Sequence, residues 1–383
     1  MLLTGCLAAE RNVSEATRVS SHWAAVSLFD EKSQVLLTSE RAQTAKADLN
    51  ILALSGGGAD GAFGAGLLAG WTESGKRPQF DIVTGVSTGA LMSTFAFIGP
   101  SADPLLEKFY TTTTTADVFT SRGLEGLLND SLYDTARLKS RLVEVIDESV
   151  LATVAAEHNK GRRLYVATTN LDAGIMSVWN MGAIAASRDQ DSLELYREII
   201  RASAAVPAFF KPVLIRVGND GGTENAQMHV DGAVKAPVLL RSFMLNGPYK
   251  HKNVYLVINS ALKLRTAETS VENSLTGIAR KSISELLRGL LYKTVYQTYV
   301  TTRRTNAAFN LAYIPDDVPA SKNPLDFNPD EMKKLFEVGR ALGRSGKAWQ
   351  HEPPRLEPFE RIEAPTTRKV SPPAMASARA SVH

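Results

Sequence analysis

Residues 80–97, Phe-Asp-Ile-Val-Thr-Gly-Val-Ser-Thr-Gly-Ala-Leu-Met-Ser-Thr-Phe-Ala-Phe, decide the fold. The apolar run from Phe80 to Thr84 is typical of a buried strand, and the small and apolar residues from Ala90 to Phe97 predict a helix. Between them lies Gly85-Val86-Ser87-Thr88-Gly89. A strand that turns sharply into a helix around a serine between two glycines is the pattern of a nucleophile elbow, in which Gly85 and Gly89 relieve crowding and Ser87 projects its hydroxyl.

An earlier segment has the same organisation. A buried strand is predicted over Leu49–Leu54, a glycine loop over Ser55–Gly58 and a helix over Ala62–Trp71. Two consecutive strand–turn–helix units predict parallel strands and an α/β fold. Further strands are predicted at 163–169, 212–217, 227–230 and 253–259, and further helices at 192–204, 278–302 and 329–342. The last helix has Asn328 as its cap, Pro329 at its first position and Gly343 after its end.

Composition bounds the possible functions. The chain has 383 residues, of which 44% are hydrophobic and 22% charged, and its formal net charge is +3. These values exclude a wholly disordered chain, a collagen-like fibre and a polytopic membrane protein. The near-neutral balance provides no global reason to bind nucleic acid, so we expect no nucleic-acid partner.

The three glycines at 56–58 have two interpretations. As an oxyanion hole, Gly56, Gly57 and Gly58 would present backbone N–H groups with no side chain in the way. The rival is a dinucleotide loop, because Gly56-x-Gly58-x-x-Gly61 matches that fingerprint. The ribose-binding acid expected at the end of the next strand is absent, and Asp81 falls near that strand's start.

No histidine is well placed as the base for Ser87. His251 precedes a strand, which puts it at the opposite edge of a parallel sheet, and His229 lies inside a strand. The others are His22, His158, His351 and His383.

A carboxylate fits better. Asp231 ends a predicted strand and is followed by a glycine that permits a tight turn. Asp220 looks similar but falls in a polar hairpin tip, where Asp-Gly is ordinary turn chemistry. Asp172 also follows a strand, and we interpret it as a turn residue.

Four ordered motifs carry a family resemblance. They are Ser55–Gly61, Gly85–Gly89, Ala202–Val213 (Ala-Ser-Ala-Ala-Val-Pro-Ala-Phe-Phe-Lys-Pro-Val) and Asp231-Gly232-Ala233. In this order and spacing the chain resembles the patatin-like phospholipases, a family of lipid acyl hydrolases, over about residues 49–260, and its last helix resembles the end of the family's fold.

The resemblance implies a three-layer α/β/α sandwich with a mainly parallel central sheet. It implies a Ser–Asp dyad without histidine, with Ser87 as nucleophile, Asp231 as base and Gly56–Gly58 as oxyanion hole. It further implies hydrolysis of lipid esters without a metal or other cofactor. The expected organisation is an N-terminal lead at 1–48, a patatin-like catalytic domain at 49–350 and a disordered tail at 351–383.

Two positions depart from the family pattern. Asp60 stands where the family usually has Arg or Lys, so either headgroup binding is weakened or Asp60 turns away from the site. Ala233 replaces the last glycine of an Asp-Gly-Gly motif. Asp60 motivates the alternative that the chain is a catalytically silent lipid-binding or scaffold protein on the same fold.

Three further segments bear on contact with membranes. Leu3-Thr4-Gly5-Cys6 resembles the end of a bacterial lipoprotein signal, so Cys6, the single cysteine, is either a lipid anchor or an ordinary thiol. With lipidation we expect the cell envelope, with the polar lead as a tether; without it, the cytoplasm or secretion. The helix at 278–302 would pack on the core or face a membrane surface, and residues 132–154 would form a lid or a covering helix. The sequence leaves the oligomeric state open.

Overall fold

The computed structural model of the chain describes residues 17–19, 26–27, 48–123, 131–187, 189–218, 224–262, 270–318 and 323–354. Cys6, the hairpin tip with Asp220 and nearly all of the 351–383 tail lie outside these ranges. Lipidation of Cys6 and disorder of the tail therefore remain predictions.

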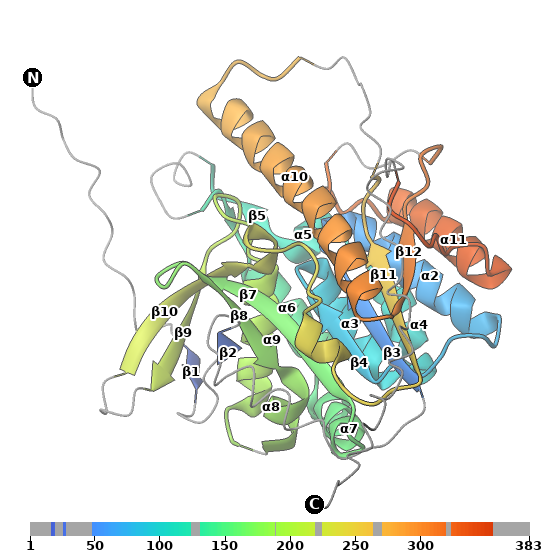
Figure 1. Cartoon of the computed structure of the whole chain (residues 1–383). Helices are drawn as coiled ribbons and strands as arrows, with labels where there is room; N and C mark the ends of the chain where they lie inside the picture. Colours follow the sequence, from blue (N-terminus) through green and yellow to red (C-terminus); the bar gives the residue numbers. More distant parts are fainter. Residues whose placement is uncertain are drawn as a thin grey trace, which may run out of the picture.

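A ten-stranded sheet forms the centre of the molecule (Figure 1). Five neighbours in it, β7 (Arg163–Asn170), β4 (Ile82–Gly85), β3 (Asp48–Leu54), β11 (His251–Ile258) and β12 (Ala308–Tyr313), run parallel. Beyond β7 the sheet continues antiparallel through β10 (Glu224–Asp231) and β9 (Val213–Gly218), and β1 (Thr17–Val19) then pairs parallel with β9. β8 (Ile175–Asn180) pairs antiparallel with β7 and with β2 (Val26–Ser27). The predicted mainly parallel sheet is confirmed.

Helices cover both faces of the sheet, because its central strands are apolar on both sides. Leu52 and Leu54 of β3 face one core, and Ile51 and Ala53 face the other. The first core is covered by α2 (Gly61–Glu73), α3 (Thr88–Ile98), α4 (Asp103–Thr112), α6 (Ala136–Val145), α7 (Glu148–Asn159), α8 (Met181–Ser187), α9 (Ser192–Ser203) and α11 (Pro329–Ser345). On the other face lie α10 (Leu275–Arg304) and the 3-10 turns η6 (Gly232–Val234) and η7 (Ser242–Leu245). This is the three-layer α/β/α arrangement.

Short elements complete the fold. Two 3-10 turns, η3 (Gly58–Asp60) and η4 (Pro100–Ala102), precede α2 and α4. The four-residue helix α5 (Thr115–Val118) leads into a small hairpin of β5 (Thr120–Ser121) and β6 (Tyr133–Asp134).

The final helix, α11, packs directly against the backbone of α2. A Cβ atom built on Gly339 would lie 2.1 Å from the carbonyl oxygen of Phe63, and one on Gly343 would lie 2.3 Å from that of Leu67. The prediction that the helix ends before Gly343 is therefore wrong. It continues to Ser345 and ends at Gly346, whose φ is 69°, because Gly343 serves close helix packing rather than termination.

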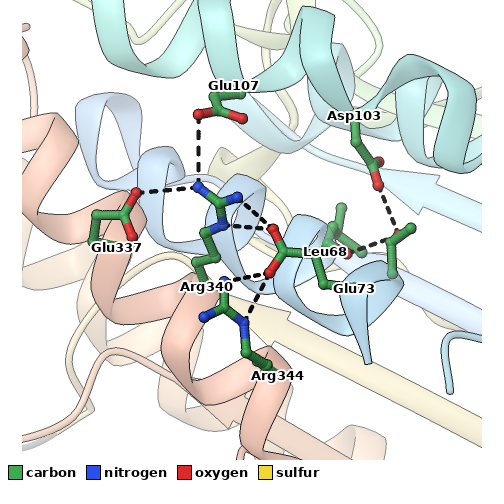
Figure 2. A network of polar contacts seen from close by, with 8 residues as sticks. Leu68, Glu73, Asp103, Glu107, Glu337, Arg340 and Arg344 are labelled. Carbon is green, nitrogen blue, oxygen red and sulfur yellow. Dashed lines mark hydrogen bonds and ion pairs between the residues drawn. The ribbon is translucent and has the colours of Figure 1, made fainter. Parts of the chain in front are cut away.

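An ion-pair network holds the exposed rim of the same helix pair (Figure 2). The Glu73 carboxylate of α2 accepts hydrogen bonds from Arg340 Nε at 2.6 Å and Arg344 Nε at 2.9 Å, both on α11. Arg340 also lies 3.9 Å from Glu107 of α4 and 3.5 Å from Glu337. The network joins three helices on one face of the sheet.

The long helix α10 has two unlike halves. Its C-terminal half packs on the core through Leu291, Val295 and Tyr299, the last in edge contact with Phe309 of β12 at 5.4 Å between ring centroids. Its N-terminal half stands clear of the sheet (Figure 1). The expectation of core packing is confirmed for the C-terminal half. No helix in the described part of the chain is both long enough and apolar enough to cross a membrane.

Candidate active site

Ser87 lies in the sharp turn between β4 and α3. Its φ of 56° and ψ of −128° are unusual for a residue with a side chain, and such strain is a recurring property of nucleophile elbows. Gly89 N–H donates to Val86 O at 2.9 Å, which closes the turn. Ser87 is half-buried and lines a cavity. The strand–turn–helix context predicted around Ser87 is present.

A second serine braces this turn from the end of helix α9. Ser203, fully buried at the end of α9, accepts a hydrogen bond from Ser87 N–H at 3.0 Å and donates one to Ala167 O of β7 at 2.7 Å. Ser203 belongs to the Ala202–Val213 motif, but the sequence alone assigned it no role. Its position shows what that motif does locally: it ties the elbow to β7.

Asp231 comes to Ser87 from the end of β10. Its backbone is held on both sides, since Asp231 N–H donates to Ala205 O at 2.9 Å and Thr169 Oγ1 donates to Asp231 O at 2.9 Å. Ala233 N–H donates to Asp231 Oδ1 at 2.8 Å, and the Ser87 side chain lies close enough to the carboxyl group to lower its pKa. The structure therefore brings together the two side chains that the sequence placed 144 positions apart.

Burial dominates the electrostatics of Asp231. The side chain is removed from water, which raises its pKa from 3.8 to about 7, while the hydrogen bond from Ala233 N–H and the nearby Ser87 side chain act in the opposite direction. A carboxyl group with a pKa near 7 is a far better proton acceptor than an ordinary aspartate.

The glycine loop after β3 lies against the elbow. A Cβ atom built on Gly56 would be 2.9 Å from Ser87 Cβ. Gly56 N–H points to Pro237 O at 3.4 Å, whereas the N–H groups of Gly57 and Gly58 have no hydrogen-bond partner within the described part of the chain. Gly57 and Gly58 are thus the donors open to a ligand, and Gly56 supplies space beside Ser87.

Distant segments hold this loop in place. Asn259, at the end of β11, donates from Nδ2 to Ser55 O at 3.0 Å and accepts from Gly64 N–H at 3.1 Å. Its carbonyl oxygen would lie 2.1 Å from a Cβ atom on Gly57. On the other side Ala59 N–H donates to Pro324 O at 2.8 Å. Sequence reasoning missed both residues, because no local pattern marks a contact over some 200 residues or more.

An apolar cavity opens beside Ser87, with about 630 Å³ of empty space when the open solvent at its mouth is included. The residues that line it come from seven segments of the chain. All of them except Gly58, Ser87 and Thr88 carry apolar side chains. These residues are Leu91, Phe109, Val118, Leu138, Leu142, Ile200, Ala204, Val206, Phe210, Leu325 and Phe327. Leu138 and Leu142 place α6 in the cavity wall, so this part of the predicted lid or covering helix covers the site.

The other candidates lie elsewhere or have other contacts. His229 is buried in β10 with Nδ1 2.9 Å from Thr168 Oγ1, and burial lowers its pKa to about 4. His251 pairs with Asp48 at the amino edge of the sheet. Asp172 is exposed and accepts from Met228 N–H at 2.8 Å, while Asn170 caps the turn.

The dinucleotide interpretation of the loop finds no support in the placement of Asp81. Asp81 precedes β4, and its carboxylate accepts from Asn50 N–H at the amino edge of the sheet. Asp60 is 5% exposed and does not line the cavity. Among the residues that the structure describes, no group of three or more His, Cys, Asp and Glu side chains is arranged to hold a metal ion.

Comparison with known proteins gives one family. Residues 52–244 match the family described as patatin-like phospholipase. No curated protein sequence matches the chain. Among solved structures, VipD from Legionella pneumophila is similar over 80% of this chain and 68% of its own length, at 13% identity and a TM-score of 0.40. ExoU of Pseudomonas aeruginosa, in complex with SpcU, is similar over 78% of this chain at 13% identity and a TM-score of 0.29. The chain spans about half of ExoU, 51%.

Proposed function

Because the chain belongs to the patatin-like phospholipase family, we propose that it is a serine acyl hydrolase that cleaves carboxylic esters of lipids, with Ser87 as nucleophile and Asp231 as base. The observation that carries the proposal is the proximity of the Ser87 side chain to the buried Asp231 carboxyl group, beside the unpartnered N–H groups of Gly57 and Gly58. Ser87 and Gly58 both line the apolar cavity, so the proposed nucleophile and one proposed oxyanion donor face the same space.

The acylation step uses these groups in order. The Asp231 carboxylate accepts the Ser87 hydroxyl proton as Oγ forms a bond to the ester carbonyl carbon. The carbonyl electrons move to the oxygen, and the Gly57 and Gly58 N–H groups stabilise the resulting oxyanion. When the intermediate collapses, the ester C–O bond breaks, and the departing alcohol takes the proton from Asp231.

Deacylation repeats the sequence with water. Asp231 accepts a proton from a water molecule, whose oxygen attacks the acyl carbon of the Ser87 ester. Collapse of the second intermediate releases a carboxylic acid and returns the proton to Ser87 Oγ. Both reaction steps use only groups of this chain and water.

The lining of the cavity supports the view that it binds the acyl chain of a lipid substrate. Its walls offer aliphatic and aromatic side chains, and its polar lining is confined to Gly58, Ser87 and Thr88 at the reacting end. An acyl chain would leave no polar group unpaired there, whereas a polar substituent would. The buried position of Asp60 supports the view that its negative charge does not face the cavity.

Hydrolysis of a panel of short- and long-chain esters and phospholipids tests the proposal. We expect Ser87→Ala and Asp231→Asn each to lose at least about 10³-fold in kcat/KM, and Ser87→Ala to lose labelling by a fluorophosphonate. Asp172→Asn is the matched control, since it removes the charge of the competing carboxylate, and it should retain activity.

Two results would contradict the proposal. Full esterase activity in Ser87→Ala would exclude that residue as the nucleophile. A folded wild-type protein that neither hydrolyses any ester nor takes the label would instead be the catalytically silent lipid-binding protein.

A further inference from the structure

The N-terminal half of α10 extends past the edge of the sheet that carries Ser87. Only residues 305–307 separate the end of α10 from β12, so the helix runs antiparallel to β12 and starts at the carboxyl edge of the sheet. Thirty residues of helix span about 45 Å, whereas the six residues of β12 span about 20 Å. Roughly half of α10 must therefore project beyond the sheet, as Figure 1 shows. We call residues 275–290 the overhang; near its C-terminal end, Leu287 packs against the core that contains Phe243 and Leu245.

The overhang exposes large apolar side chains. Leu286 is 69% exposed and Ile278 51% exposed, the two highest values among the large hydrophobic residues in the described part of the chain. They are eight residues apart, which places them about 80° apart on the helix and hence on one side of it. Val271, just before the helix, is 44% exposed. A globular core would have buried such residues, and the C-terminal half of the same helix does bury its own.

Positive charge accompanies these apolar residues. Residues 275–290 contain Arg280, Lys281 and Arg288 against a single acidic residue, Glu285, a net charge of +2. Lys281 pairs with Glu285 at 2.6 Å, and both side chains are about half exposed. Exposed ion pairs of this kind are weak, so Lys281 can readily exchange Glu285 for another anion.

We propose that the overhang docks the protein on the surface of an anionic lipid bilayer. Ile278 and Leu286 would enter the boundary between headgroups and acyl chains, and the exposed Lys281 would contact lipid phosphates. Because the overhang starts at the carboxyl edge, docking brings that edge of the sheet, with Ser87, towards the bilayer. The proposal rests on the proposed function in one respect: the bilayer would hold the ester substrate.

Sedimentation with vesicles tests the docking surface. The full chain carrying Cys6→Ser, so that no lipid anchor contributes, is mixed with vesicles of phosphatidylcholine alone or with about one third phosphatidylglycerol. We expect partition onto the anionic vesicles, at least about tenfold weaker in Leu286→Glu and roughly fivefold weaker in Lys281→Gln. Leu105→Glu is the matched control, because Leu105 is 45% exposed near the start of α4. It should bind as the parent protein does.

Further measurements keep the docking surface and the proposed function separate. Ser87→Ala should bind vesicles as the parent does, and Leu286→Glu should hydrolyse a soluble short-chain ester at the parent rate, with an unchanged circular dichroism spectrum. If the parent protein hydrolysed no ester but still bound anionic vesicles, the proposed function would be contradicted and the docking proposal would stand.

Three outcomes would overturn the docking proposal: no partition of the parent onto anionic vesicles, equal partition of Leu286→Glu, or an equal loss in Leu105→Glu. If Leu286→Glu abolishes self-association in sedimentation equilibrium but leaves vesicle binding intact, the overhang is an interface between copies of this chain.

Discussion

The two glycine turns at the carboxyl edge of the sheet are built in opposite ways. The elbow at 85–89 is closed by its own strand and helix and braced by Ser203, which lies in the next motif along the chain. The loop at 56–58 has few internal contacts, the Asp60 N–H to Gly57 O bond among them, and is held between Asn259 and Pro324. The turn of the elbow is therefore closed by local contacts and braced from 116 positions away, whereas the loop is held almost entirely by residues that are distant in the chain.

Because the two turns are held by different residues, the nucleophile and the oxyanion donors are positioned independently of each other. A substitution at Asn259 or Pro324 should displace the Gly57 and Gly58 N–H groups without moving Ser87.

Gly57→Ala should give the largest effect among changes to the loop and its supports. The new Cβ atom would lie 2.1 Å from Asn259 O, so the loop must shift and the two N–H donors with it. We expect kcat to fall about 10²–10³-fold, the cost of losing an oxyanion donor, measured with a soluble ester. Gly289→Ala, where a Cβ atom meets nothing within 4 Å, is the control and should keep full activity. An unchanged kcat in Gly57→Ala would show that the loop is not the oxyanion hole.

The pH dependence of hydrolysis should report Asp231. Only the ionised carboxylate can accept the Ser87 proton, and the pKa of Asp231 is raised to about 7. We expect kcat/KM to fall about tenfold for each pH unit below 7, or about a hundredfold at pH 5. A profile that stays flat down to pH 5 would contradict Asp231 as the base.

The same raised pKa makes a prediction about stability. The folded protein binds the Asp231 proton more tightly than the unfolded chain does. This preference contributes fully to the free energy of unfolding below about pH 4, and the contribution is lost as pH rises through about 7. Asp231→Asn avoids this loss. It should therefore increase the free energy of unfolding by a few kcal/mol at pH 8 and leave it unchanged near pH 4, as measured by urea denaturation at the two pH values.

Asn259→Ala should have a smaller effect on catalysis, because it removes the support of the loop and not the donors. We expect kcat to fall about tenfold and the free energy of unfolding to fall by about 1–3 kcal/mol, since Gly64 N–H and Ser55 O lose a buried partner. Asn253→Ala, on the same strand at its amino end, should keep kcat unchanged. An equal loss of kcat in both variants would indicate general destabilisation.

Glu73→Gln should change least. Its ion pairs with Arg340 and Arg344 are partly exposed, so the free energy of unfolding should fall by about 1 kcal/mol or less, with kcat unchanged. Urea denaturation of this variant beside Gly339→Ala, whose new Cβ would meet Phe63 O at 2.1 Å, compares the rim with the packed centre of the α2–α11 pair. A larger loss in Glu73→Gln would contradict this ranking.

The contrast between the turns also explains what could be predicted from sequence. The strands, the elbow and Asp231 follow from local patterns, namely buried apolar runs that end at glycines. Asn259, Pro324 and Ser203 act through contacts that leave no local pattern. Gly343 has the spacing of a helix end, and only the presence of α2 shows that it is a packing residue. For α10, the apolar periodicity covers both halves equally, and the length of β12 decides which half is buried.

The contact between Gly58 and Pro324 also sets a time at which the site can form during synthesis. At an elongation rate of about 5–20 residues per second, Pro324 is synthesised roughly 15–50 s after Gly58. Ser87 and Asp231 emerge from the ribosome within that interval, yet the loop beside them still lacks Asn259, then Pro324, and finally α11 behind α2. A nascent chain would therefore carry its nucleophile before its oxyanion donors are fixed, and hydrolytic activity would begin only when nearly the whole catalytic domain has been made.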